Sequence, residues 1–193
     1  MSGFATGKQA TIVAGRACGK CSLCCKVLGI GELEKPAGSW CTHCRPGKAG
    51  CLIYQDRPSE CITFNCLWLT SAELDAAWHP LSSKIVVHLE NDGNRVAVRV
   101  DAAFPTRWRE EPYYARLKQW ARYGVDHRAQ VVVYVGERAT VVLPNKDVDL
   151  GPLAPGDFIM IEESKGPVGR DWRAYVEPAA NFSPADRDRW LRS

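Results

Sequence analysis

The stretch "KIVVHLENDGNRVAVRVD", residues 84–101, predicts a β-hairpin. Two runs of β-branched residues flank the turn "NDGN", and Asp92 and Gly93 are residue types that adopt the positive φ of a tight turn. Strands of this kind pair directly across a short connection. We therefore expect an antiparallel sheet to form the core of this part of the chain.

The pattern continues towards the C-terminus. Residues 130–135 and 139–144, separated by a short glycine-containing turn, predict a second hairpin, and residues 157–163 and 172–178 predict two further strands. The repeated exchange of apolar runs with turn residues is typical of a small sheet.

Two helices are expected beside these strands. The first covers residues 111–124, with Pro112 in its first turn and Gly124 as its stop signal. Its apolar face comprises Tyr113, Leu117, Trp120 and Ala121. The second covers residues 183–193, where Ser183 is the expected N-cap, Pro184 follows it and Asp186 occupies the capping-box position. Together with the strands, these helices predict an α+β fold.

The chain changes character on the N-terminal side of the hairpin. All nine cysteines lie between Cys18 and Cys66, in a segment rich in glycine and proline. Such a segment has few ladders of hydrogen bonds, so a bound metal is a natural source of its order. We expect an irregular cysteine-rich metal-binding module over residues 1–70, packed on an α+β part over residues 71–193. The two parts either fold separately or form one integrated domain.

The N-terminus and composition bear on the compartment. The first 20 residues mix polar and apolar types and lack the apolar run of a secretory signal, and the longest apolar stretches have strand length. We expect a soluble, cytoplasmic protein with no membrane partner. In a reducing cytosol, nine cysteines favour metal or redox chemistry over disulfides.

The cysteine spacing supports metal binding. It reads C-x2-C-x2-C-C, then 15 residues, then C-x2-C-x6-C-x9-C-x4-C. An x2 interval lets two sulfur atoms reach one ion while amides of the turn donate to them. Adjacent Cys24 and Cys25 do not readily enter the same tetrahedron, so they indicate two neighbouring sites or one spare thiol.

The motifs "CGKCSLCC" and "CRPGKAGCLIYQDRPSECITFNC" resemble the YkgJ-like cysteine-cluster family, described as a putative zinc- or iron-chelating domain. The resemblance covers residues 18–68 and implies metal or cluster binding, with no settled activity. It implies these ligands: Cys18, Cys21, Cys24, Cys25, Cys44, Cys51, Cys61 and Cys66. It also marks Tyr54, Arg57, Pro58 and Phe64 as fixed companions. Cys41 departs from the pattern and is either free or a substitute for a neighbour.

The identity of the metal stays open at this point. Eight pattern cysteines would fill two four-coordinate zinc sites, which is the favoured interpretation, with a structural or interaction role. A run of x2 intervals with a remote fourth cysteine also suits an iron–sulfur cluster in a redox protein or enzyme component. His43 lies between cysteines and is a further, less favoured ligand.

Neither catalysis nor nucleic-acid binding has a clear signal. The common nucleophile, zinc-protease and phosphate-loop motifs are absent, and His79, His88 and His127 are scattered, so the sequence leaves open whether the chain is an enzyme. Residues 107–128 interleave arginines with aromatics, but the same spacing describes an amphipathic helix on a sheet. A formal net charge of +3 is weak support for nucleic acid, and a protein partner is the alternative.

Overall fold

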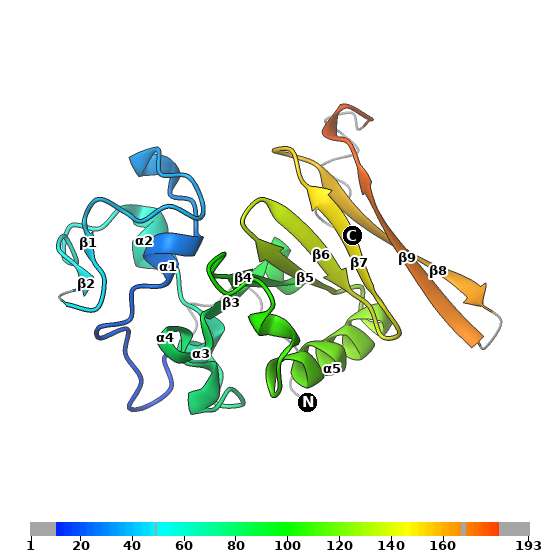
Figure 1. The fold of residues 1–193 in the computed structure, drawn as a ribbon, viewed down its shortest axis with the longest axis horizontal. Coiled ribbons are helices and arrows are strands. Elements are labelled where there is room, and N and C mark those ends of the chain that lie inside the picture. The colour runs from blue at the N-terminus through cyan, green and yellow to red at the C-terminus, as the bar shows by residue number, and fades with distance from the viewer. Residues whose placement is uncertain (1–10, 49, 167–168, 182–193) are drawn as a thin grey trace.

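The computed structural model describes residues 11–48, 50–166 and 169–181 of the 193-residue chain, and its fold belongs to the expected mixed α and β class (Figure 1). The helices are α1 Cys24–Val27, α2 Ser59–Thr63, α3 Leu67–Thr70, α4 Pro80–Ser83 and α5 Tyr113–Asp126. The strands are β1 Cys44–Arg45, β2 Gly50–Cys51, β3 Ile85–Glu90, β4 Arg95–Val100, β5 Gln130–Val135, β6 Arg138–Val142, β7 Asp147–Pro152, β8 Phe158–Gly166 and β9 Gly169–Glu177. Short 3₁₀ turns cover Gly31–Leu33, Ala76–Trp78, Asn91–Gly93, Arg107–Arg109 and Ala179–Asn181.

The predicted hairpin over residues 84–101 is confirmed. Strands β3 and β4 pair antiparallel, with His88 opposite Ala97. The turn between them has φ of 51° at Asp92 and 91° at Gly93. The connection therefore uses the left-handed backbone that the Asp-Gly pair tolerates.

The main sheet is mixed, whereas the sequence predicted an antiparallel one. Its order is β3-β4-β5-β6-β7, and β4 pairs parallel with β5. A parallel pair needs a long crossover, and here the chain between these strands contains α5. The hydrophobic pattern identified both strands, but it carried no information about which strands become neighbours.

Strand β7 was missed in the sequence, because two aspartates and a glycine interrupt its apolar pattern. It pairs antiparallel with β6 at the edge of the sheet, where polar residues face solvent without penalty. The hairpin β5–β6 and the pair β8–β9 agree with the expected strands.

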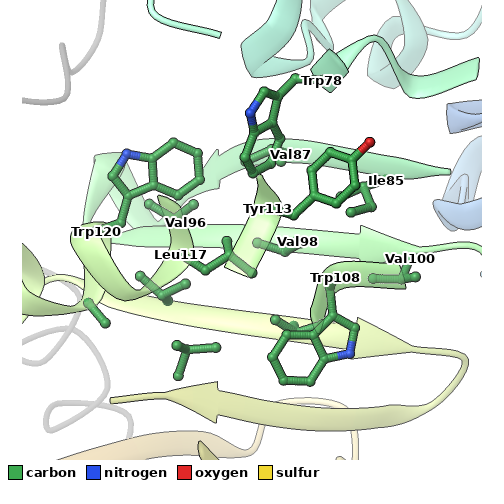
Figure 2. Close-up of a cluster of buried hydrophobic side chains, with 14 of the residues drawn as sticks. Trp78, Ile85, Val87, Val96, Val98, Val100, Trp108, Tyr113, Leu117 and Trp120 are labelled. Carbon is green, nitrogen blue, oxygen red and sulfur yellow. The ribbon is translucent and has the colours of Figure 1, made fainter. Parts of the chain in front are cut away.

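Helix α5 covers one face of the sheet with the predicted apolar stripe (Figure 2). Tyr113, Leu117 and Trp120 are buried against valines of β3, β4 and β5. The helix was expected over residues 111–124 with Pro112 in its first turn, but Pro112 is the residue before the helix, and Gly124 lies within its last turn and does not end it. A Cβ atom built on Gly124 would lie 2.4 Å from the backbone oxygen of Ala129. The glycine therefore permits the chain to turn closely from α5 into β5.

This contact predicts that Gly124→Ala destabilises the protein by about 2 kcal/mol, because the backbone must move to relieve the clash. Helix propensity alone would favour alanine by about 1 kcal/mol. Urea unfolding of the variant measures the difference. Ala115→Gly, at an exposed position of the same helix, is the matched control and should cost about 1 kcal/mol. An unchanged or increased stability of Gly124→Ala would contradict the close approach.

The opposite face of the sheet is covered by two different elements (Figure 1). The pair β8–β9 contributes Ile159 and Trp172 to a cluster with valines of β5 and β6. Beside β3, the cysteine-rich segment contributes Leu23, Val27 and Leu69 to a smaller cluster around Val86. The cysteine module and the pair β8–β9 therefore cover different parts of the same sheet face.

Polar contacts also connect the cysteine module to the α+β part. The Nζ atom of Lys26 lies 2.6 Å from Oδ1 of the buried Asp101, at the end of β4. The guanidinium of Arg16 donates to the carbonyl oxygens of Trp68, Ser71 and Leu74. The independent folding of residues 1–70 and 71–193 stays a prediction.

Two further expectations concern the ends of the chain and membranes. The helix expected over residues 183–193 lies outside the described residues. Within the ranges that the structure describes, no helix has both the length and the apolar character needed to cross a bilayer.

Candidate metal centre

A cavity of about 520 Å³ lies between the cysteine module and the first two strands of the sheet. Its walls come from the loops of the module, from α1 and α3, and from residues of β3 and β4. Eight of the nine cysteines line it: Cys18, Cys21, Cys24, Cys25, Cys41, Cys51, Cys61 and Cys66. Cysteines far apart in sequence are therefore gathered around one space.

Tight turns position the N-terminal cysteines. The amide of Cys21 donates to the carbonyl of Cys18 over 2.7 Å, and the turn between them has φ of 49° at Gly19. The amide of Cys25 then donates to Ser22 over 3.0 Å at the start of α1. This part of the motif is thus a turn followed by one turn of helix.

The central cysteines are positioned by pairing with the first group. The amide of Cys41 donates to the carbonyl of Cys25 over 2.9 Å, and the amide of Cys44 donates to the carbonyl of Cys41 over 3.0 Å. Strands β1 and β2 then place Cys51 directly opposite Cys44. Cys44 itself is buried but does not line the cavity.

The last two cysteines lie at the starts of short helices. The amide of Cys61 in α2 donates to the carbonyl of Pro58, the residue before that helix, and Cys66 is the residue before α3. Glu32 accepts from the amide of Glu60 over 3.0 Å, which ties α2 to the loop that follows α1.

Backbone amides donate to two of the sulfur atoms. Leu23 and Leu81 donate to the sulfur of Cys21, and Trp68 and Leu69 donate to that of Cys66. Amides that point at sulfur are typical of thiolates bound to metal, because they offset the negative charge. The structure therefore supplies part of the environment that such ligands need.

Crowding and burial raise the pKa values of six of the thiols: Cys18, Cys21, Cys25, Cys44, Cys61 and Cys66. Burial raises the pKa of Cys66 to about 11 and that of Cys44 to about 11. The pKa of Cys25 is raised first by its hydrogen bond with Cys24 and then by burial. The pKa values of Cys18 and Cys61 are raised by burial and by neighbouring cysteines.

Two basic residues face the thiols. The positive charge of Arg57 opposes the rise in the pKa of Cys18 and Cys61, and its Nε atom is buried with no hydrogen-bond partner. Its guanidinium lies 3.8 Å from the ring centroid of Tyr54, so Tyr54 packs over Arg57. Burial lowers the pKa of Lys35, while nearby Cys41 and Cys25 oppose this shift.

The donor set suits zinc or an iron–sulfur cluster in its chemistry, but the thiols are not arranged around an ion. All nine cysteines are free of disulfides. Among the described residues, no group of three or more His, Cys, Asp or Glu side chains has an arrangement that would hold a metal. Binding would have to draw the sulfur atoms further into the cavity. The unpartnered Nε of Arg57 is then available to a thiolate.

The structure places most of the expected ligands as a set. Seven of them line the cavity and Cys44 does not, although its sulfur is hydrogen-bonded with that of Cys25. Cys41, which departs from the family pattern, lines the cavity and is 8% exposed. His43 also lines it.

Three cavity residues from the sheet were not recognised as a group in the sequence: His88, Glu90 and Arg99. The signal was available in principle. His88 and Glu90 occupy alternate positions of β3 and therefore share one face with Val86, which is buried. Polar residues on a covered face of a sheet are unusual and point to a site.

The remaining histidines and the aromatic stretch have structural positions. Nδ1 of His79 accepts from the amide of Leu81 at the start of α4, and His127 stacks on Tyr123. Tyr113 and Trp120 lie in the core, as the interpretation of an amphipathic helix on a sheet requires.

These thiols predict that zinc uptake releases protons. Because the pKa values of six cysteines are raised, the metal-free chain holds these six thiols protonated at neutral pH. Two four-thiolate sites should then release about eight protons, and zinc affinity should fall as the pH falls. Calorimetry in buffers of different ionisation enthalpy counts these protons. Release of about four protons or fewer would contradict binding by eight thiols.

Comparison with known proteins found no matching family model, no curated protein and no solved structure similar to the chain. The resemblance to the YkgJ-like family therefore rests on the two quoted motifs.

Proposed function

We propose that this chain is a cysteine-cluster metal-binding protein in which residues 18–66 bind two zinc ions with a structural or interaction role. The gathering of seven of the eight proposed ligands around one cavity carries the proposal. Thiols that merely fill a core need not surround a common space, and free buried thiols gain little from one another.

Two details of the site support this proposal. The amides that point at the sulfur atoms of Cys21 and Cys66 suit the charged form of these ligands. The buried Nε of Arg57 lacks a partner, and a metal-bound thiolate would provide one. Both features become favourable only when thiols are converted to thiolates, which a metal ion does.

The proposed ligands are the eight pattern cysteines, and the number of thiols favours zinc. Two tetrahedral zinc sites use all eight, whereas one iron–sulfur cluster would use four and leave the rest as buried thiols. An all-thiolate zinc site has no open position, which is why we assign it a structural or interaction role.

Visible absorption tests the class of metal. Protein purified without oxygen should be colourless and contain zinc. A brown sample that absorbs near 400 nm would show that the protein binds an iron–sulfur cluster and not zinc. The protein would then be assigned as a redox protein or enzyme component. Addition of a chelator to the same sample should release the zinc, and this release can be followed with a colorimetric indicator.

A further inference from the structure

All the buried side-chain nitrogen or oxygen atoms without a hydrogen-bond partner in the described residues belong to one cavity. They are Nε of Arg57, Nε2 of His88 and Nε of Arg99, and each of these residues lines the cavity that the cysteines surround. Native proteins rarely leave such groups without partners, so each one requires an explanation. Arg57 lies near the thiols and is explained by the metal centre, but His88 and Arg99 come from the sheet.

The fold brings His88 and Arg99 to the same face of the sheet. Alternation along β3 places His88 on the face of Val86, while β4 places Arg99 directly opposite Val86. His88 is opposite Ala97, so His88 and Arg99 are diagonal neighbours across the pair. The two unpartnered groups are thus fixed on rigid elements and not on mobile side chains of a loop.

Two contacts hold the guanidinium of Arg99. Its Nη2 atom donates to Oε1 of Glu90 over 2.9 Å, and its Cζ atom lies 3.7 Å from the ring centroid of Tyr134. These contacts leave Nε without an acceptor. The guanidinium is therefore oriented before any ligand binds.

His88 is held in a similar way. Its ring packs edge-on against Phe64, with 5.4 Å between the centroids, and Nε2 lies 3.5 Å from Oε1 of Glu90 without forming a hydrogen bond. Burial lowers the pKa of His88, so its ring is neutral at neutral pH. A hydrogen bond with the backbone of Leu89 opposes this shift, and Nε2, the ring nitrogen without a partner, donates when it carries a ring proton.

The charge on this sheet face is positive. Glu90 is approached by both Arg99 and Arg95, at 2.9 and 3.6 Å, so one carboxylate serves two guanidinium groups. A single negative charge would balance the group. The positive charges of Arg57 and Lys35 act on the cysteines of the module and would offset the charge of a metal centre.

The wall beside these donors is apolar. Leu28, Phe64, Leu69 and Val86 line the same cavity. A ligand that fits this end therefore combines a charged head with an apolar body, as small-molecule sites commonly require.

We propose that the sheet end of this cavity binds a small organic carboxylate, whose oxygens accept from Nε of Arg99 and Nε2 of His88 while its apolar body lies against Phe64 and Val86. Two donors match the two oxygens of one carboxylate, and its single negative charge matches the excess positive charge. The proposal goes beyond metal binding and does not depend on it.

The test uses benzoate as the probe and the full chain as purified, labelled with ¹⁵N-arginine. Titration should shift the Nε–Hε signal of Arg99 in a saturable way, with a dissociation constant of about 1 mM or tighter. Benzamide has the same shape without the charge and should leave the signal unchanged. The exposed Arg138, which is paired with Asp149, is the internal control and should not move.

Variants then assign the contacts. Arg99→Gln should weaken benzoate binding about tenfold or more, since it removes a charged donor. The ring signals of Phe64 report binding in this variant, and Arg138→Gln should bind as the wild type does. If Arg99→Gln does not fold, His88→Gln provides the same comparison.

The proposal is overturned if benzoate leaves the Arg99 signal unmoved at 10 mM, about ten times the expected constant, or if benzamide binds equally. Equal binding by the Arg99 variant would also overturn it. Zinc content is measured on the same samples to keep this result separate from the metal proposal. A wild-type sample that contains no zinc but still binds benzoate contradicts only the metal proposal.

Discussion

Cys25→Ser is expected to remove at least one of the two zinc ions and to unfold the segment around α1. The sulfur of Cys25 is hydrogen-bonded with those of Cys24 and Cys44, and it interacts electrostatically with Cys18 and Cys61. Cys25 therefore interacts with cysteines of both halves of the module. Structural zinc contributes about 10 kcal/mol in zinc-finger peptides, which is comparable to the whole stability of a small domain.

Elemental analysis of the purified variant measures the loss, and Cys41→Ser is the matched control. Cys41 also lines the cavity and is more deeply buried than Cys25, but it lies outside the pattern of the two motifs, so its variant should keep both ions. Loss of zinc from Cys41→Ser, with full zinc in Cys44→Ser, would show that Cys41 takes the place of Cys44 in the ligand set. Full zinc content in Cys25→Ser would contradict the proposed partition.

Removal of zinc by a chelator is expected to unfold residues 18–66 while the sheet persists. The module has short helices, a two-residue strand pair and a small apolar cluster around Val86. The sheet has its own core on both faces, formed by α5 on one side and by β8–β9 on the other. Without metal, about 10 kcal/mol of folding free energy is lost from the module alone.

Hydrogen exchange with and without chelator tests this division. Amides of residues 18–66 should exchange at the rate of an unfolded chain, whereas those of β4 and β5 should keep their protection. Uniform loss of protection across the chain would show one integrated core. The ion pair of Lys26 with Asp101 and the contacts of Arg16 are the links that would transmit such unfolding.

Local patterns predicted the elements of the fold better than their arrangement. The Asp92–Gly93 turn and the apolar stripe of α5 are properties of neighbouring residues, and both were identified. The parallel pairing of β4 with β5 and the edge strand β7 depend on tertiary neighbours, which a single sequence does not specify. Gly124 was predicted to end the helix because glycine commonly does so. Its close contact with Ala129 exists only in the folded chain, so the sequence did not show it.

The site shows the same limit. Cysteine spacing predicted that the thiols serve a common purpose, and the structure gathers them around one cavity. His88 and Arg99 were not grouped, since they become partners only when β3 and β4 pair and the module covers them. The alternation of side chains along a strand showed which residues share a face, but it did not show that the cysteine module would cover this face.

Native mass spectrometry of the chain purified without oxygen tests the central claim most directly, because it counts metal ions on the intact protein. Two zinc ions per chain, with four protons lost for each ion, are the expected result. A fully reduced chain that carries no metal, and that takes up none when zinc is added, would contradict the proposal that residues 18–66 form a metal centre.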